Sequence, residues 1–198
     1  MSRFLAYLSR LKFIARWGLK RNTTAENVVE HSWEVAVIAH LLANIRNARF
    51  GGQLDANAIA AAALFHDASE VLTGDMPSPV KYHSPEITRA YKAIEHQAQV
   101  ELWRLLPEAM QPAYRPLLLD EAMPPEHHEV IKTADTIAAL LKCRHEIRAG
   151  NREFETAHAD ISLKVEAMAA ERPEVRYFLD HFEPSFEMTL DELLSRRG

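Results

Sequence analysis

Residues 55–75 read DANAIAAAALFHDASEVLTGD, an alanine-rich apolar run that passes directly into a histidine and an aspartate. Alanine and leucine are strong helix formers, so this stretch predicts a helix from about Asp55 to Leu72. The pair His66–Asp67 follows an almost wholly apolar segment, residues 59–65. The stretch therefore predicts an α-helix that carries polar chemistry at the end of its apolar part.

Helical periodicity continues on the N-terminal side of this stretch. Apolar residues recur with helical spacing between Phe4 and Ile14 and predict a first amphipathic helix. Thr23-Thr24-Ala25-Glu26 has the form of a capping box, so a second helix is expected to start there and to run to the glycine pair Gly51–Gly52. Residues 74–79 contain two prolines and predict a loop.

The C-terminal half shows the same pattern. Ser84-Pro85-Glu86 combines an N-cap, a proline at the first helical position and an acid in the first turn. The long helix expected after it has an apolar stripe from Ile87 to Leu105, and further helices are expected over 125–150, 154–168 and 175–182. Strand alternation is hardly seen, and no linker divides the chain. The sequence predicts one all-α domain, a helical bundle over residues 1–198.

Composition narrows the class of protein. The 198 residues include 47% hydrophobic residues and six glycines, and the net charge is -5, so there is no basic field for nucleic acid. The single Cys143 excludes an internal disulfide and favours a reducing, cytoplasmic location. No apolar run reaches the roughly 20 residues that span a bilayer, so no membrane contact is expected. The acid-free segment 1–22 also resembles a transit peptide, and this alternative stays open.

Four residues from three expected helices form a candidate metal site: His31, His66, Asp67 and Asp135. Apolar neighbours at i−4 and i+3 suggest that Asp135 points inward, where an unpaired carboxylate would be costly. A shared divalent cation removes that cost. Two imidazoles and two carboxylates suit Mn, Fe, Co, Ni or Zn better than Mg or Ca.

Other interpretations of these residues remain open at this stage. A single helical histidine is more often an ordinary core or surface residue, and Asp135 could instead cap a helix or pair with an arginine. The order His…His-Asp…Asp raises the probability of a metal site. The eight remaining histidines form no second compact His/Asp set with helical ligand spacing, so we expect one divalent transition metal per chain.

Longer motifs surround these four residues and resemble a known family. They are Arg10-Leu11-Lys12, Arg16-Trp17, Glu26-Asn27-Val28, Glu30-His31-Ser32, the run from Phe65 to Asp75, Pro79-Val80-Lys81-Tyr82 and Lys132-Thr133-Ala134-Asp135. The order His…His-Asp…Asp is similar to the signature of the HD-domain superfamily, and the motifs resemble its bacterial 5′-deoxynucleotidase family. The resemblance implies an HD-type helical fold, cobalt or manganese as cofactor, hydrolysis of deoxyribonucleoside 5′-monophosphates and a homodimer.

Glu70 is the candidate proton-handling residue. It lies i+4 from His66 and i+3 from Asp67, and on a continuous helix these three side chains would share one face. A carboxylate there could move a proton between water and the leaving 5′ oxygen. The alternative is a solvated helix glutamate.

The resemblance also implies residues that contact the substrate. Arg16 has the planar fork that suits phosphate oxygens, and Trp17 offers a flat face to the nucleoside. Asp75 could accept from a sugar hydroxyl or help orient the phosphate in catalysis, and His31 and Asp135 are expected to touch substrate as well as metal. Arg16 could also be a surface residue, Trp17 a core residue and Asp75 part of an ordinary Asx-turn.

Three functions are compatible with these observations. The first is a 5′-monophosphatase that prefers deoxyribose. The second is another HD phosphohydrolase acting on a nucleoside triphosphate or bis-phosphorylated nucleotide, which would need more lysines and arginines near the motifs. The third is a non-catalytic helical module with a structural metal, which would need neither Glu70 nor Arg16.

Overall fold

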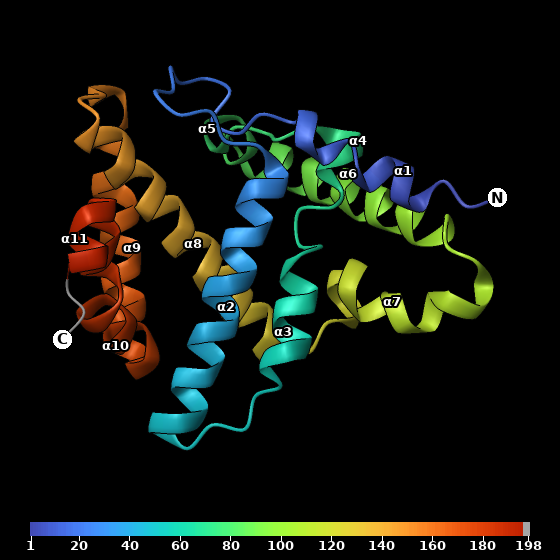
Figure 1. Ribbon diagram of the computed structural model, residues 1–198. Helices are drawn as coiled ribbons and strands as arrows, with labels where there is room; N and C mark the ends of the chain where they lie inside the picture. The colour runs from blue at the N-terminus through green and yellow to red at the C-terminus, as the bar shows by residue number, and fades with distance from the viewer. Residues whose placement is uncertain (196–198) are drawn as a thin grey trace.

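The computed structural model describes residues 1–195, and helices make up nearly all of their regular structure (Figure 1). Strand-like pairing within this part of the chain is limited to a single bridge between Ala15 and Asn27. The predicted all-helical fold is therefore confirmed. Residues 196–198, which the single-domain prediction included, lie outside the described residues. Within residues 1–195, no helix combines the length and apolarity needed to cross a membrane.

The helices have the following bounds. In chain order they are α1 (Phe4–Leu8), α2 (Val28–Phe50), α3 (Ala56–Ala63), α4 (Glu70–Thr73), α5 (Ser78–Lys81), α6 (Pro85–Arg104), α7 (Gln111–Leu118), α8 (Pro125–Arg148), α9 (Glu155–Glu171), α10 (Pro173–His181) and α11 (Leu190–Ser195). Short 3-10 helices, η1 to η5, cover Leu11–Phe13, Glu108–Met110, Asp120–Ala122, Arg152–Phe154 and Glu183–Glu187.

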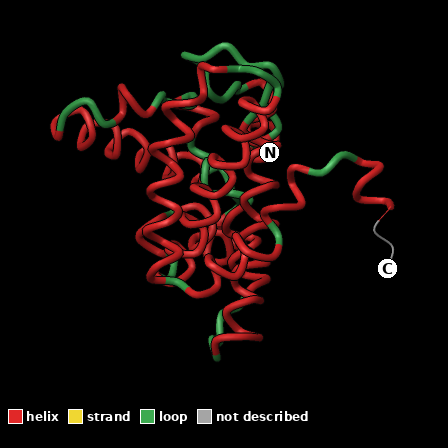
Figure 2. The backbone as a smooth tube through the Cα atoms, turned by 90° about the vertical axis from the view of Figure 1, so that its left-hand side faces the viewer, coloured by secondary structure: helices red, strands yellow, loops and turns green. Residues whose placement is uncertain are grey.

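Helix α2 is the centre of the larger hydrophobic core, where it contacts α3, α8 and α10, and α9 covers α8 (Figure 1). A smaller core joins α1, α6 and α7 through residues such as Phe4, Leu102 and Leu118. Ala68, in the segment between α3 and α4, belongs to this smaller core, so residues 64–69 lie where the two cores meet. Helix α11 extends away from the rest of the molecule (Figure 2).

The start of α2 differs from the sequence prediction. The N-cap is Asn27, whose side chain accepts from the backbone of Val29 and Glu30, while Glu30 completes the capping box. The predicted box at 23–26 was wrong. Thr23 and Thr24 instead bond to Glu146 and His145 of α8, so both threonines lie outside α2. The far end of α2 agrees with prediction, since Gly51 adopts the left-handed conformation that ends a helix.

The single helix predicted from Asp55 to Leu72 is interrupted. Helix α3 stops at Ala63, residues 64–69 form successive turns, and α4 starts at Glu70. The His66 side chain takes part in this change, because its Nδ1 lies 2.8 Å from the Ala63 carbonyl oxygen at the end of α3. The predicted loop at 74–79 was only partly correct, because α5 begins inside it with Pro79 in its first turn, where proline is tolerated.

Three further comparisons concern the remaining helices. The first predicted helix is divided, because α1 ends at Leu8 and only the 3-10 helix Leu11–Phe13 follows; the backbone is then extended at Ile14, whose carbonyl accepts a hydrogen bond from the Val28 N–H. The helices expected after Ser84, Pro125, Phe154 and Pro173 are confirmed. In the stripe on α6, Tyr91, Ala98 and Leu102 are buried, whereas Ile87 and Ile94 are exposed, so only part of the stripe is core.

Candidate metal centre and active site

The first predicted ligand, His31, lies one turn into α2 and is 1% exposed. Its Nδ1 is 3.5 Å from Oε1 of Glu26. Its Nε2 faces two carboxylates, at 3.2 Å from Asp135 Oδ1 and 3.7 Å from Asp67 Oδ2. A carboxylate behind one ring nitrogen leaves the other nitrogen as the basic, ligating atom.

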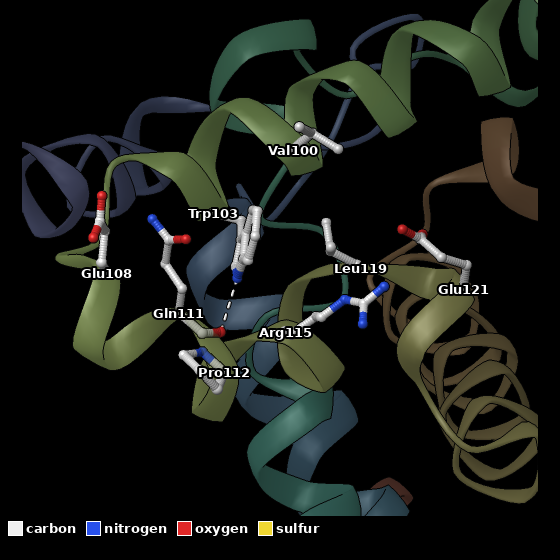
Figure 3. A pocket seen from close by; sticks show the side chains of 8 residues that line it. All are labelled: Val100, Trp103, Glu108, Gln111, Pro112, Arg115, Leu119 and Glu121. Atoms are coloured by element: carbon white, nitrogen blue, oxygen red, sulfur yellow. Dashed lines mark hydrogen bonds between the residues drawn. The ribbon is translucent and has the colours of Figure 1, made fainter.

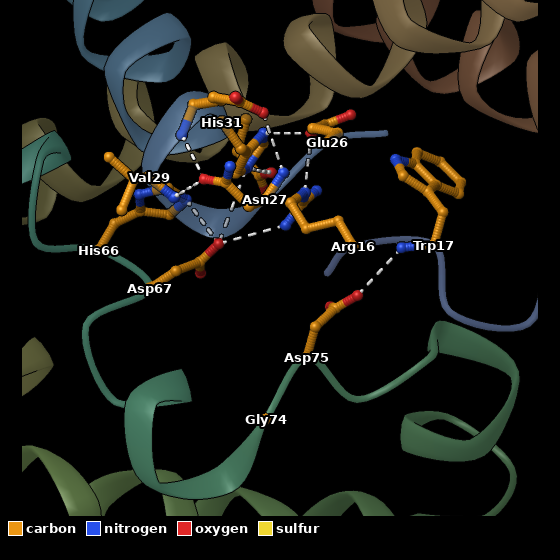
Figure 4. Close-up of polar contacts among 12 residues, drawn as sticks. Arg16, Trp17, Glu26, Asn27, Val29, His31, His66, Asp67, Gly74 and Asp75 are labelled. Atoms are coloured by element: carbon orange, nitrogen blue, oxygen red, sulfur yellow. Dashed lines mark hydrogen bonds and ion pairs between the residues drawn. The ribbon is translucent and has the colours of Figure 1, made fainter. Parts of the chain in front are cut away.

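The pair His66–Asp67 sits on the turns that follow α3. The 2.8 Å contact between His66 Nδ1 and the Ala63 carbonyl oxygen assigns the proton to Nδ1, which leaves Nε2 as an acceptor. That Nε2 is 3.1 Å from Asp67 Oδ2, and the two imidazole rings of His31 and His66 have centroids 5.3 Å apart (Figure 4). Two basic nitrogens and a carboxylate oxygen therefore converge from α2 and from the turn.

Asp135 reaches this group from α8. One carboxylate oxygen is 3.2 Å from His31 Nε2, and the other accepts from Lys132 at 3.1 Å, one turn earlier on α8. The side chain is 24% exposed, in agreement with the predicted inward orientation. Asp135 thus joins the cluster through His31.

These side chains fit a divalent cation. The Nε2 atoms of His31 and His66 are both buried without a hydrogen-bond partner. Ligand atoms of His31, His66 and Asp67 lie within 4.8 Å of one another, the one such group of at least three residues among residues 1–195. Donors at about 2.0–2.2 Å from one ion lie at most ~4.4 Å apart, so only a small contraction is needed.

Charge within the cluster is strongly coupled. Burial alone would raise the pKa of Asp67, but the adjacent His66 imidazole outweighs it and lowers that pKa. Burial likewise opposes ionisation of Asp135, whose pKa is nevertheless lowered by the adjacent His31 imidazole and by the Lys132 ammonium. Both carboxylates are therefore ionised at neutral pH, the form that binds metal.

Glu70, at the start of α4, is 8% exposed, and its Oε2 has no hydrogen-bond partner. Burial raises the pKa of Glu70 to about 9, and the charges of Asp67 and Asp75 act in the same direction. It reaches the site across a turn, so the expected helical register with His66 was wrong. A buried carboxyl that holds a proton beside the candidate metal ligands is suited to acid–base chemistry.

Arg16 is the cation of the site. Its Nε donates to Glu26 Oε1 at 2.9 Å, and Nη1 lies 3.4 Å from Asp67 Oδ2 (Figure 4). The backbone holds it in place, because the Arg16 N–H donates to the carbonyl of Glu26 beside the Ala15–Asn27 bridge. A guanidinium with an edge toward Asp67 is placed to meet an anion bound at the same point.

Trp17 and Asp75 contact each other beside Arg16, farther from the candidate metal ligands. Trp17 has φ 59°, a left-handed conformation that is unusual for a bulky residue, and its backbone N–H donates to Asp75 Oδ2 at 3.2 Å. Its indole packs against Phe154 in a tilted arrangement, with ring centroids 5.2 Å apart, and lies on the far side of Arg16 from His66 and Asp67 (Figure 4). Burial raises the pKa of Asp75, against the opposing effect of Arg16. Backbone strain of this kind is concentrated at functional sites.

Two residues of the site were not identified from the sequence. Glu26 was named only in a presumed capping box and within a motif, yet it links Arg16 to His31. Lys132 was quoted only within a motif, yet it holds Asp135. Its spacing of one helical turn from Asp135 was a signal that could have indicated the pair.

Of two cavities between the helices, one borders the site and the other does not. The larger, which we call the α2–α8 groove, has a volume of about 1630 Å³ and reaches from His31 and Glu26 to residues 183–189. The smaller, about 500 Å³, lies between α6 and α7, where the Trp103 indole donates to the Gln111 carbonyl (Figure 3). None of the predicted site residues lines the smaller cavity, so it is separate from the cluster.

Comparison with known sequences gives one consistent result. The model of the family described as 5′-deoxynucleotidase YfbR-like matches residues 3–186. The 5′-deoxynucleotidase VV1113 of Vibrio vulnificus is 47% identical over 194 residues, which cover 97% of this chain and 98% of that protein. The 5′-deoxynucleotidase YfbR of Escherichia coli O127:H6 is 48% identical over 192 residues, covering 97% and 96%.

Solved structures support the fold. An HD-domain phosphohydrolase (lin2634) from Listeria innocua superimposes with a TM-score of 0.80 at 27% identity, over 93% of this chain and 88% of that one. The cyanophage S-2L HD phosphohydrolase DatZ, solved with dA and one catalytic Zn²⁺, shares the fold with a TM-score of 0.61 at 24% identity, over 93% and 96%.

Proposed function

The chain belongs to the YfbR-like 5′-deoxynucleotidase family of HD-domain phosphohydrolases. From this premise we propose which residues bind metal, transfer protons and bind the substrate. It is a phosphomonoesterase that acts on deoxyribonucleoside 5′-monophosphates. HD-domain phosphohydrolases bind a divalent metal. We propose that one transition-metal ion, cobalt or manganese, is bound per chain, and that the enzyme acts in the cytoplasm, where its free Cys143 stays reduced.

The proposed ligands are His31, His66, Asp67 and Asp135. The observation that carries this proposal is the pair of buried histidine Nε2 atoms that lack hydrogen-bond partners and face carboxylate oxygens. When bound, a divalent cation would polarise water and a phosphate oxygen and offset transition-state charge. His31 and Asp135, which meet at 3.2 Å, would also lie against the substrate phosphate.

Glu70 is the proposed acid–base residue. Its raised pKa keeps a proton on the carboxyl, and a neighbouring cation would lower that pKa toward neutrality. In the reaction the bond between phosphorus and the 5′ oxygen breaks while a bond from phosphorus to the water oxygen forms. Glu70 would deliver a proton to the leaving 5′ oxygen and take one from the attacking water, which leaves the carboxyl unchanged overall.

Arg16 is proposed to orient the phosphate, with Trp17 and Asp75 binding the sugar. Arg16 already contacts the Asp67 carboxylate. When a phosphate binds there, Arg16 would exchange this carboxylate for the phosphate as its anionic partner. The indole of Trp17 lies beyond Arg16, where the nucleoside would follow the phosphate. Asp75 fixes the Trp17 backbone with one oxygen, and its other oxygen would accept from the sugar hydroxyl.

The cations around the site support a monophosphate over a triphosphate substrate. Lysines and arginines near the cluster already have acidic partners: Arg16 with Glu26, Lys81 with Glu95, and Lys132 with Asp135. Lys20 Nζ donates to the backbone carbonyl of Glu153, and the Arg21 guanidinium lies 3.9 Å from the Glu153 carboxylate. Three negatively charged phosphates would need cations that are free to pair with them.

The sugar assignment predicts a change in selectivity. Phosphate release should be measured on dAMP, AMP and dATP with manganese or cobalt. The wild type should prefer dAMP to AMP, because Trp17 leaves no room for the 2′-hydroxyl, and should release little phosphate from dATP. An apolar wall rejects an added hydroxyl by about 10²-fold at most. Trp17→Ala should lower turnover of dAMP and narrow its advantage over AMP.

The outcome that contradicts the role of Trp17 is an unchanged ratio of kcat/KM values for dAMP and AMP in Trp17→Ala. Phe154→Leu is a second probe of the same contact, because it removes the ring against which Trp17 packs while keeping an apolar side chain at this buried position. If Trp17 excludes the hydroxyl by shape, Phe154→Leu should also narrow the ratio, by a smaller factor.

We also propose that the enzyme is a homodimer that buries the exposed apolar surface of the α2–α8 groove. Trp33 on α2 is 63% exposed and lines this groove, and Leu193 and Leu194 on α11 are about half exposed. Exposed tryptophans are typical of interface centres. Light scattering after gel filtration should give twice the chain mass for the wild type and for Leu5→Glu, an exposed control on α1. Trp33→Glu should be monomeric, and a monomeric wild type would contradict the proposal.

A further inference from the structure

Glu146 is a buried charge that the proposed mechanism does not use. It lies on the last turns of α8, is 0% exposed, and its two oxygens accept from donors on three different segments. These donors are the Lys142 ammonium, the Asn151 amide, the Thr23 hydroxyl and the backbone N–H groups of Thr23 and Thr24. Burial alone would raise the pKa of Glu146, but the hydrogen bonds from Lys142, Thr23 and Asn151 together lower it.

Most of these hydrogen bonds come from one loop, residues 17–26. We call it the arginine loop, because it directly follows Arg16. Lys142 donates to the Thr24 carbonyl as well as to Glu146, and Asn151 donates to the Arg21 carbonyl as well as to Glu146. The loop has no helix of its own, and Thr23, Thr24 and Ala25 are exposed. Its tip is therefore held by side chains of α8 and of the segment that follows α8.

The two ends of the arginine loop carry the contacts that place Arg16. The Arg16 N–H donates to the Glu26 carbonyl at 3.0 Å, and the Arg16 guanidinium donates to the Glu26 carboxylate at 2.9 Å. Glu26 is two residues from Thr24. The Thr24 N–H donates to Glu146, and the Thr24 carbonyl accepts from Lys142. A shift of Thr23 and Thr24 would therefore move Glu26, whose carboxylate orients the Arg16 guanidinium.

We propose that Glu146, with Lys142 and Asn151, is a positioning device for phosphate binding, which holds the arginine loop so that Arg16 meets the substrate phosphate in one geometry. This inference rests on the phosphate role proposed for Arg16. A buried ion pair contributes little net stability compared with apolar residues of similar volume, because removing both charges from water costs free energy. We therefore explain the pair by the geometry that it specifies. Misplacing a phosphate-orienting group by about 1 Å can cost roughly 10²-fold in rate.

The test is a double-mutant cycle on kcat/KM for dAMP. Lys142→Met with Glu146→Gln removes both buried charges together, so that neither is left unpaired. This double variant should lower kcat/KM by about 10²-fold in the wild-type background. In an Arg16→Ala background the same double change should cost less than about 3-fold, because there is no guanidinium left to misplace. Metal content, measured by elemental analysis, should stay at the wild-type value.

A milder pair of variants covers the case in which the double variant does not fold. Thr23→Val removes only the hydroxyl that donates to Glu146, and Thr23→Ser keeps it. Thr23→Val should lower kcat/KM by roughly 10-fold while Thr23→Ser stays near the wild type, and the Thr23→Val effect should vanish in the Arg16→Ala background.

The outcomes separate this inference from the function on which it rests. If Arg16→Ala alone leaves kcat/KM unchanged, the phosphate role of Arg16 is wrong. If Arg16→Ala lowers kcat/KM but the Lys142/Glu146 and Thr23→Val changes cost the same factor in both backgrounds, the phosphate role stands. The positioning device is then overturned, because equal factors mean that Glu146 supports the fold without acting through Arg16.

Discussion

Replacing His31 by alanine should abolish phosphate release from dAMP and leave the purified protein with almost no bound metal. His31 is the one proposed ligand that contacts both Asp67 and Asp135. Its loss therefore removes the link through the site between Asp135 on α8 and Asp67 on the turn after α3. Thermal stability should fall as well, because a ligand that binds only the folded state stabilises it by about 4 kcal/mol at roughly 1,000 times its Kd. Chelation of the wild type should lower both activity and Tm in the same way.

The matched control for this prediction is His40→Ala. His40 lies on the same helix, is exposed, and contacts Asn44 on the helix surface. It should keep the metal content and the activity of the wild type. Single alanine changes at His66, Asp67 and Asp135 should behave like His31→Ala. A chelated protein with metal content near zero and full activity would show that the cluster is not the catalytic centre.

Glu70→Gln should retain its metal and lose about 10²–10⁴-fold in kcat, the usual cost of removing a general acid or base. The amide has the shape of the carboxyl but can neither deliver a proton to the 5′ oxygen nor take one from water. KM for dAMP should change little. Glu171→Gln, an exposed glutamate at the end of α9, is the control and should be fully active. Loss of metal from Glu70→Gln would instead place Glu70 among the ligands.

The same substitution should change how stability depends on pH in the chelated protein. The pKa of Glu70 rises from 4.5 to about 9 on folding, so the folded state keeps a proton that the unfolded chain releases. The stability linked to this proton is complete below about pH 4.5 and is lost as the pH rises through 9. Glutamine loses no proton, so the Tm of Glu70→Gln should exceed that of the wild type by an amount that grows from pH 5 to pH 9. About 1 kcal/mol corresponds to roughly 2–4 °C. A constant Tm difference over this range would contradict a buried neutral carboxyl.

Several features of this protein could be read from the sequence by itself. Helical spacing and strong local signals, such as Ser84-Pro85-Glu86 and Gly51, predicted most of the helices, because caps and periodicity depend on neighbouring residues. The order of His31, His66, Asp67 and Asp135 predicted a cluster that the structure brings together at His31. Chemistry that needs particular residue types can be recognised in a sequence even before their distances are known.

The local signals failed where long-range contacts compete with them. The threonines at 23 and 24 looked like a helix cap, yet Glu146, more than 120 residues away, accepts their N–H groups. The helix expected to continue through His66 stops at Ala63, where the His66 side chain contacts the helix-end carbonyl oxygen. In both cases a partner that is distant or specific to the site outweighed the weak intrinsic preference of the backbone.

The sequence by itself therefore determined the helical class, the family and the identity of the candidate ligands. Only the tertiary structure decided how they are aimed: that Glu26 joins Arg16 to His31, that Lys132 holds Asp135, and that burial keeps a proton on Glu70. The physical reason is that propensity and motif order act along the chain. Hydrogen-bond partners, burial and pKa depend on groups that only folding brings within a few ångströms.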